Sequence, residues 1–251
     1  MRNEAIQLSV VIPAYNEARR IGPSLQRLVD YLRGRYGAGG FEIIVVDDGS
    51  DDRTVSVVQQ FMARTPEVRL ICFPQNRGKG AAVRAGMLAA AGGAALFSDA
   101  DLSTPIEEVE EALKLLAEGS DVVIGSRGLA SSQIIVRQNR VRELLGKLFN
   151  LLLRTFLQIP FRDTQCGFKL FRHEAAQRIF HRARTDGFAF DVEAILIAFQ
   201  LGYAVREMPV RWVNDPDSKV TLLRHPVQML SEVWRIRRDF ANRALRRSRD
   251  R

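Results

Sequence analysis

The sequence predicts an α/β protein built on a mostly parallel sheet that helices cover on both faces. Three observations support this class: short apolar runs alternate with helical periodicity, the runs are continuously apolar rather than alternating, and polar clusters follow them. A chain of 251 residues with 46% hydrophobic and 26% charged residues can bury a large core. Composition by itself points to no particular chemistry.

The predicted strands and helices alternate along the first half of the chain. The strands are expected at 8–12, where Pro13 ends the apolar run, and at 41–46, 68–73, 94–97 and 121–125. The helices between them are expected at 22–36, in a segment ending near residue 62, at 80–91 and at 105–118. Because parallel strands need such crossover connections, this order predicts successive βαβ units.

A first amphipathic helix is predicted at about 140–159, in the second half of the chain. Its apolar stripe is interrupted by Lys147 and Arg154, so it is too short and too charged to cross a bilayer. It suits the interface of a membrane, and packing in the protein core is the alternative.

A second amphipathic helix, basic in character, is predicted at 221–251, after one large domain over 1–220. Residues 235–251 contain eight arginines and two aspartates, which is +6 of the chain's formal charge of +8. Trp234 and Phe240 add aromatic side chains to the same segment. We expect it to lie on an anionic membrane surface, with a solvated helix end as the alternative.

The two cysteines, Cys72 and Cys166, form no CxxC pair. The sequence therefore predicts a reducing compartment, with neither a disulfide nor a zinc site. Cys72 lies within an apolar run and is expected in the core.

Polar clusters follow the predicted strands at 13–17, 47–52, 76–80 and 99–101. The carboxyl ends of parallel strands share one edge of a sheet, where open α/β sheets bind their ligands. Asp99 and Asp101 concentrate negative charge that a divalent cation would neutralise. Each cluster alone fits a turn or a helix cap, but four at one edge favour a binding site.

Two common nucleotide-binding motifs are absent. A Rossmann fingerprint needs glycines directly after the first strand, where Pro13, Tyr15 and Asn16 stand. A P-loop needs a glycine at position 73, where Phe73 stands, and Ser or Thr at position 80, where Gly80 stands. Acidic loops with a metal ion suit a nucleoside diphosphate that the ion bridges.

Four segments carry a resemblance to a known family: 13–17 reads Pro-Ala-Tyr-Asn-Glu, 47–51 Asp-Asp-Gly-Ser-Asp, 76–80 Asn-Arg-Gly-Lys-Gly and 99–101 Asp-Ala-Asp. They resemble the successive motifs of family-two inverting glycosyltransferases with a GT-A fold, a Rossmann-like sheet with an Asp-x-Asp motif. The similarity continues through 125–127, 162–169, 188–193 and 217–219, and so covers nearly the whole chain. It is strongest to the dolichyl-phosphate glucosyltransferase branch, with dolichyl-phosphate mannose synthases as relatives.

The resemblance implies a set of site residues and makes 1–220 the catalytic domain. Asp99 and Asp101 are expected to bind Mg²⁺ or Mn²⁺, and a third ligand is not assigned because mannose synthases commonly have Gln where Ser103 stands. Catalytic roles are expected for Asp101, Asp191 and Arg127, where Asp191 orients a sugar hydroxyl or the acceptor, or else caps a helix. The expected nucleotide-sugar-binding residues are Pro13, Tyr15, Asn16, Glu17, Asp48, Gly49, Ser50, Gly78, Lys79, Asp99 and Lys219.

The acceptor is expected to be a lipid phosphate. Arg127, Arg137 and Arg140 are candidates for holding it, because guanidinium groups bind phosphate bidentately, although surface arginines are often only solvated. A phosphate monoester has a second pKa of about 6, so its oxygen can attack the sugar without a strong base.

We therefore expect a metal-dependent enzyme that transfers glucose from UDP-glucose to a polyprenyl phosphate (dolichyl or undecaprenyl), with inversion, as a peripheral protein at the cytoplasmic face of a membrane. One alternative is transfer of mannose or another hexose from GDP-mannose or another sugar nucleotide. The other is a basic module that binds nucleic acid through its arginine tail. We expect no nucleic-acid partner, because the acidic loops would repel phosphates without a metal.

Overall fold

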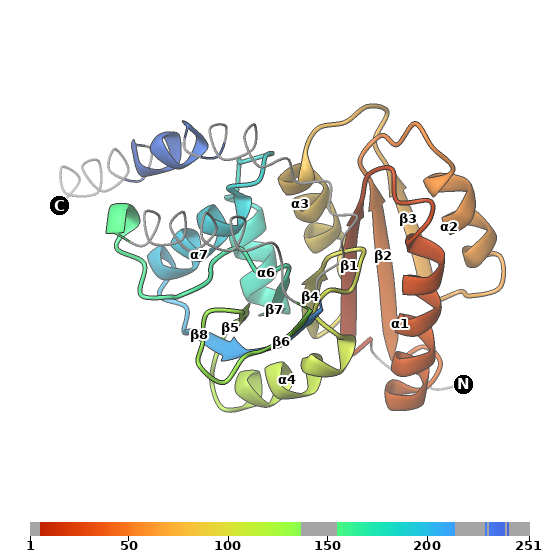
Figure 1. Ribbon diagram of the computed structural model, residues 1–251, viewed down its shortest axis with the longest axis horizontal. Helices are drawn as coiled ribbons and strands as arrows, with labels where there is room; N and C mark the ends of the chain where they lie inside the picture. The colour runs from red at the N-terminus through yellow and green to blue at the C-terminus, as the bar shows by residue number, and fades with distance from the viewer. Residues whose placement is uncertain (1–5, 137–154, 214–228, 230, 239, 241–251) are drawn as a thin grey trace.

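The computed structural model of the chain describes residues 6–136, 155–213, 229, 231–238 and 240. Within these residues, seven strands form one sheet in the order β3-β2-β1-β4-β7-β5-β8 (Figure 1). Every neighbouring pair is parallel except those of β7, which runs antiparallel to β4 and β5, so the predicted mostly parallel sheet is confirmed. The strands are β1 (Leu8–Ala14), β2 (Phe41–Asp47), β3 (Val68–Cys72), β4 (Ala94–Ser98), β5 (Val122–Ser126), β7 (Phe168–Arg172) and β8 (Val205–Pro209). Two further strands, β6 (Gln133–Val136) and β9 (Arg211–Val213), pair with each other.

Helices pack on both faces of the large sheet and enclose two separate cores. One core contains residues of α1 (Ile21–Tyr36), α2 (Thr54–Met62), the short η1 (Ile106–Glu108) and α4 (Val109–Ala117). The other contains residues of α3 (Lys79–Ala89), α6 (His173–Phe180) and α7 (Phe190–Gln200). Successive residues of β2 alternate between the two cores, as Ile43 and Ile44 do. This alternation explains why the strands read as continuously apolar runs.

Several predicted boundaries differ from those in the structure for physical reasons. β1 continues through Pro13 to Ala14, because its pairing with β4 ends at Val11 and the missing N–H of Pro13 breaks no bond to that strand. The predicted helix 105–118 is η1 followed by α4, and β7 lies where the sequence predicted no strand.

The prediction for Cys72 is wrong: this residue is exposed rather than in the core. It is the last residue of β3, which forms the edge of the sheet next to β2 and is only partly covered. An apolar run on an edge strand does not guarantee burial of every side chain.

The two predicted amphipathic helices lie mostly outside the described residues. Of the first, residues 155–157 are helical, and of the second, residues 229, 231–238 and 240 are helical. Val233 and Ile236 are buried in the same core as α7, and the blue C-terminal segment lies near that helix in Figure 1. Trp234 is 57% exposed. None of the helices in the described part of the chain has the length and apolar character that a membrane crossing requires.

Candidate functional site

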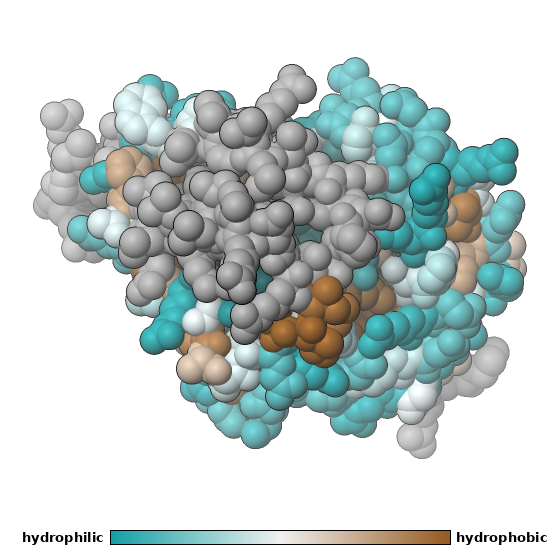
Figure 2. Space-filling model, in the orientation of Figure 1, coloured by the Kyte–Doolittle hydropathy of each residue, from teal (hydrophilic) through white to brown (hydrophobic). Residues whose placement is uncertain are grey.

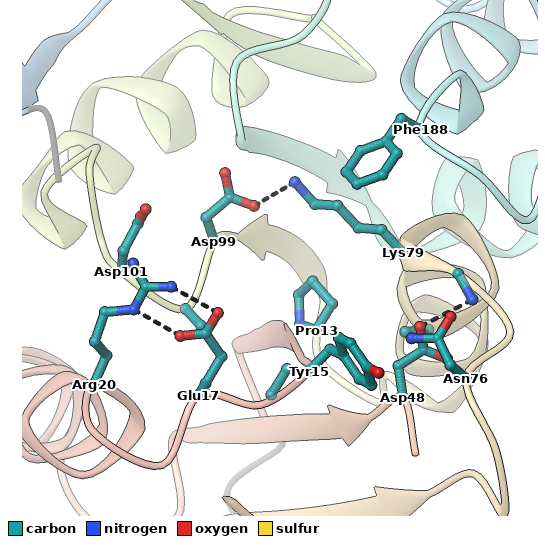
Figure 3. A pocket seen from close by; sticks show the side chains of 14 residues that line it. Pro13, Tyr15, Glu17, Arg20, Asp48, Asn76, Lys79, Asp99, Asp101 and Phe188 are labelled. Carbon is teal, nitrogen blue, oxygen red and sulfur yellow. Dashed lines mark hydrogen bonds and ion pairs between the residues drawn. The ribbon is translucent and has the colours of Figure 1, made fainter. Parts of the chain in front are cut away.

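A cavity of about 400 Å³ lies at the carboxyl ends of β1, β2 and β4. The parallel register of these strands, with Ala14 opposite Asp47, brings the loops that follow them to one edge of the sheet. Phe188, which precedes α7, adds a wall from the second half of the chain (Figure 3). The cavity is lined by Pro13, Ala14, Tyr15, Glu17, Arg20, Asp48, Asn76, Gly78, Lys79, Ala82, Asp99, Ala100, Asp101 and Phe188. All four polar clusters of the sequence thus contribute to it.

Lys79 and Asp99 form an ion pair in this cavity, with 2.7 Å between Lys79 Nζ and Asp99 Oδ1 (Figure 3). Lys79 is the first residue of α3, and its Nζ lies 5.3 Å from the centroid of the Phe97 ring. Burial alone would lower the pKa of Lys79, but the charge of Asp99, helped by Asp191, raises it. Lys79 therefore keeps its positive charge at neutral pH.

Asp101 supplies the second carboxylate after β4, and its Oδ1 accepts a hydrogen bond of 2.9 Å from the Ser103 N–H. Burial and the neighbouring charge of Asp99 raise the pKa of Asp101, so a cation beside the two carboxylates would stabilise their ionised forms. Among the described residues, no three His, Cys, Asp or Glu side chains form a metal-binding group. Two carboxylates fit a divalent cation such as Mg²⁺ or Mn²⁺ whose remaining ligands come from water and substrate.

Two further acidic residues of the cavity are held by partners. The buried Asp48 accepts hydrogen bonds from the Arg77 N–H at 2.7 Å and the Gly78 N–H at 2.9 Å, which fix the loop before α3. Burial raises the pKa of Asp48. The Glu17 carboxylate accepts hydrogen bonds from Arg20 Nε at 2.7 Å and from Arg20 Nη2 at 2.8 Å.

Asn16, Gly49 and Ser50 are not among the residues that line the cavity. The Asn16 N–H donates to Ser50 Oγ at 2.8 Å, and the Asn16 side-chain oxygen accepts from the Asp51 N–H at 2.8 Å. Gly49 has a φ of 72° and lies against the backbone at Gln75, where a side chain would overlap. These three residues join the loops that carry the lining side chains.

Asp191 and Arg127 also lie outside the cavity lining, each bound to a partner within the protein. Asp191 is buried and its Oδ1 is 2.5 Å from Lys169 Nζ, which also donates to the Cys166 carbonyl at 2.6 Å. Arg127 binds Asp163 through Nε at 2.6 Å and Nη2 at 3.1 Å. The other expected site residues, Lys219, Arg137 and Arg140, fall outside the described residues.

The sequence prediction missed three polar or aromatic lining residues: Arg20, Asn76 and Phe188. Arg20 follows Glu17 by three residues, a spacing that allows ion pairs at a helix start. Asn76 is the first residue of the 76–80 cluster, so the reasoning that selected Lys79 could also have selected Asn76. Phe188 begins the 188–193 segment of the family resemblance, but only the tertiary fold shows that it reaches the cavity.

The chain is similar to several known proteins. The model of the family described as "Glycosyl transferase family 2" matches residues 9–180, from β1 to the end of α6. The dolichyl-phosphate beta-glucosyltransferase of Saccharomyces cerevisiae is 36% identical, covering 94% of this chain and 75% of the yeast protein. The dolichyl-phosphate beta-glucosyltransferase of Homo sapiens is 35% identical, covering 96% of this chain and 78% of its own length.

A solved structure supports the fold. Mannosyl-3-phosphoglycerate synthase from Rubrobacter xylanophilus matches with a TM-score of 0.65 and 19% identity, over 97% of this chain and 75% of that one. Its sheet and helices thus correspond to those described above, which identifies the fold as GT-A-like. With the family motifs gathered at one cavity and the family model matching most of the sequence, the chain belongs to glycosyl transferase family 2.

Proposed function

We propose that the protein transfers glucose from UDP-glucose to a polyprenyl phosphate, such as dolichyl phosphate, to give a β-linked polyprenyl-phosphate glucose. The observation that carries this proposal is the cavity where Lys79, Asp99 and Asp101 meet at the end of β4. The names of the relatives in yeast and human supply the sugar and the lipid class.

The donor is proposed to bind with its diphosphate beside Lys79, which is charged and fixed by Asp99. Asp99 and Asp101 would hold Mg²⁺ or Mn²⁺, which when bound neutralises the charge that develops on the departing diphosphate. Asp48 and Glu17 present carboxylate oxygens to the hydroxyl and N–H groups of ribose and base. Lys219 is proposed to bind the donor as well.

The acceptor is proposed to react through its own phosphate oxygen, which is largely anionic at neutral pH because the second pKa of a phosphate monoester is about 6. This oxygen bonds to the anomeric carbon while the bond from that carbon to the UDP oxygen breaks, and UDP leaves. Attack opposite the leaving group converts the α-linked donor into a β-linked product. No strong general base is needed, so the buried Asp191, bound to Lys169, suits positioning rather than proton transfer.

Arg127, Arg137 and Arg140 are proposed to hold the acceptor phosphate. Because Asp163 binds Nε and Nη2 of Arg127, a phosphate would be met by Nη1 of this side chain. The Asp163 carboxylate fixes the direction of the guanidinium plane, which reduces the entropy lost when a phosphate binds.

The protein is proposed to work on the cytoplasmic face of a membrane through its C-terminal helix. Trp234 is 57% exposed and Arg238 lies 5.3 Å from its ring, while Arg237 lies 4.1 Å from the Phe156 ring. Exposed aromatic side chains combined with arginines suit the headgroup region of an anionic leaflet. Figure 2 shows further apolar side chains exposed on one face, beside the residues drawn in grey.

The decisive experiment measures transfer by the purified chain with a short-chain polyprenyl phosphate, Mg²⁺ or Mn²⁺, and a panel of UDP- and GDP-sugars. Transfer from UDP-glucose with a β-anomeric product, read from the proton NMR signal of the anomeric position, is expected. Transfer from GDP-mannose instead would keep the mechanism and replace the donor. A chain that transfers from no donor to any polyprenyl phosphate would contradict the proposed acceptor.

A further inference from the structure

Glu232 is a buried carboxylate of the C-terminal helical segment 231–238 that reaches the loop in front of α7. Its side chain is 5% exposed, and its Oε2 accepts a hydrogen bond of 3.0 Å from the Ala189 N–H. A side chain on Gly187 would overlap the same carboxylate, so the loop backbone lies directly against it. Glu232 takes no part in the transfer chemistry proposed above, so its burial needs another explanation.

The loop that Glu232 contacts, residues 184–189, is fixed at its other end by a second buried carboxylate. Glu193 Oε2 accepts hydrogen bonds from the Arg184 N–H at 2.9 Å and the Thr185 N–H at 2.7 Å. Two acidic side chains from different helices therefore bind the backbone N–H groups of one short loop. Buried carboxylates in this role hold a backbone conformation that the local sequence does not dictate.

The same loop supports the donor cavity from two sides. The Asp186 carbonyl accepts hydrogen bonds from the Gly80 N–H at 2.8 Å and the Ala81 N–H at 3.2 Å, at the start of α3. Side chains on Gly78 or Gly80 would overlap this loop's backbone, which accounts for the glycines on either side of Lys79. Phe188, between Gly187 and Ala189, lines the cavity beside Lys79 (Figure 3).

The C-terminal segment makes a second contact with the border of the site. Gln165 Nε2 donates to Met229 Sδ at 3.4 Å, and Gln165 belongs to the segment that precedes β7. In that segment, Gly167 lies against the Asp99 carboxylate. Val233 and Ile236 anchor the C-terminal segment in the core shared with α3 and α7.

We propose that Glu232 is a positioning residue for the nucleotide-sugar cavity: it fixes the backbone at Gly187–Ala189 and thereby holds Phe188 and the first turn of α3 in the donor-binding arrangement. The inference rests on the proposed function, since it assigns the cavity to a nucleotide sugar. It also makes the basic C-terminal helix part of the donor site, because the residue that orders the cavity wall lies two positions before the exposed Trp234.

The test compares the full-length wild type with Glu232→Ala, Glu232→Gln and Gly187→Ala. In Glu232→Gln, the side chain keeps an oxygen that can accept the hydrogen bond from the Ala189 N–H. In Gly187→Ala, the added methyl group comes from the loop and displaces the Glu232 carboxylate without removing its charge. Glu174→Ala is the matched control, because it truncates an exposed glutamate on α6. Two quantities are measured: amide hydrogen exchange of a peptide covering 184–190, and the dissociation constant of UDP with Mn²⁺.

We expect Glu232→Ala and Gly187→Ala to raise exchange in that peptide about tenfold and to weaken UDP binding about tenfold, the size of a lost hydrogen bond to a charged group. Exchange in β1 and β2 stays at the wild-type level, which a general loss of stability would not allow. Glu232→Gln and the Glu174→Ala control remain close to wild type.

Unchanged exchange at 184–190 in Glu232→Ala overturns the proposal, as does a rise of equal size throughout the sheet. A Glu232→Gln variant as defective as Glu232→Ala overturns it too, because the hydrogen bond would then not be the operative contact. If the wild type itself fails to bind UDP, the proposed donor is wrong, and the exchange measurements still decide the role of Glu232.

Discussion

Asp101 shares the end of β4 with Asp99, and the two negative charges disfavour each other in the absence of a cation. We predict that Asp101→Asn lowers metal-dependent glucosyl transfer roughly 100-fold or more, because one of two anionic ligands is lost. The Asn side-chain oxygen can still accept the Ser103 N–H, and removal of one charge relieves repulsion, so the thermal unfolding midpoint should not fall.

Initial rates of transfer across a Mn²⁺ titration, with a thermal melt of each protein, check this expectation. Near-normal turnover by Asp101→Asn would remove Asp101 from the metal site.

Gly167 decides where the Asp99 carboxylate can lie. The Asp99 N–H donates to the Gly167 carbonyl at 3.1 Å, and a methyl group on Gly167 would overlap the Asp99 carboxylate itself. We predict that Gly167→Ala lowers the rate of glucosyl transfer about as much as the loss of a metal ligand in Asp101→Asn, because the Asp99 carboxylate must move away from the cavity. Assays at saturating Mn²⁺ and UDP-glucose measure the effect.

Gly34→Ala is the control for this substitution. Gly34 lies within α1 with no atom near its added methyl, so the variant should transfer glucose normally and gain up to about 1 kcal/mol of stability from helix propensity. A Gly167→Ala protein that is as active as Gly34→Ala would mean that Asp99 tolerates displacement.

At the scale of elements, Arg127 and Asp163 tie the end of β5 to the segment that leads into β7. Asp163 is buried and accepts hydrogen bonds from the Arg127 N–H and side chain and from the Gln165 N–H. Burial alone would raise the pKa of Asp163, but the charge and hydrogen bonds of Arg127 hold it at about 2, below the ordinary value of 3.8.

A carboxyl group whose pKa is lowered in the folded state stabilises the fold when the pH is above the pKa that the group has in the unfolded state. This contribution is lost as the pH falls toward the pKa of the group in the folded state. We predict that the wild type loses about 2 kcal/mol more unfolding free energy than Asp163→Asn between about pH 5 and about pH 2. Urea unfolding at several pH values measures both curves, and the other carboxyl groups cancel in the comparison. Parallel curves would contradict a stabilising role for this ion pair.

At the scale of the whole molecule, the positions of the first five strands along the chain could be predicted, and four of them, β1, β2, β4 and β5, are buried on both faces. A strand with helices on each side needs apolar residues at every position, which leaves a local signal in the sequence. β7 left no such signal, since it contains Lys169 and Arg172. The charge of Lys169 is matched by Asp191 on α7, a partner that only the tertiary fold reveals.

The candidate site could also be predicted in part from the sequence. Asp99 and Asp101 after β4, and Lys79 where α3 begins after β3, line the cavity because parallel topology brings these strand ends to one edge. Phe188 follows no predicted strand, and the amphipathic pattern of 221–251 does not show what Glu232 contacts. Their roles depend on how the second half of the chain packs on the first.

The distribution of charge over the molecule leads to a prediction about membranes. Most of the net positive charge lies in 235–251, and the described helical residues 231–238 place Trp234 and Arg238 in contact at the surface. We predict that replacing Arg235, Arg237 and Arg238 together by Gln weakens binding to anionic vesicles roughly 100-fold, since each arginine near such a surface contributes about 1 kcal/mol. Trp234→Ala should weaken binding at every salt concentration, because its contribution is apolar.

Vesicle sedimentation at low and high salt separates the two contributions, since salt screens the arginines and leaves the contribution of Trp234 in place. Arg178→Gln on α6 is the matched control: this arginine is exposed, and its loss changes the net charge without touching the C-terminal segment. Equal binding of the triple variant and the wild type would contradict membrane docking through this helix. Tight binding of the wild type to duplex DNA, with none to vesicles, would instead assign the arginines to a nucleic-acid surface.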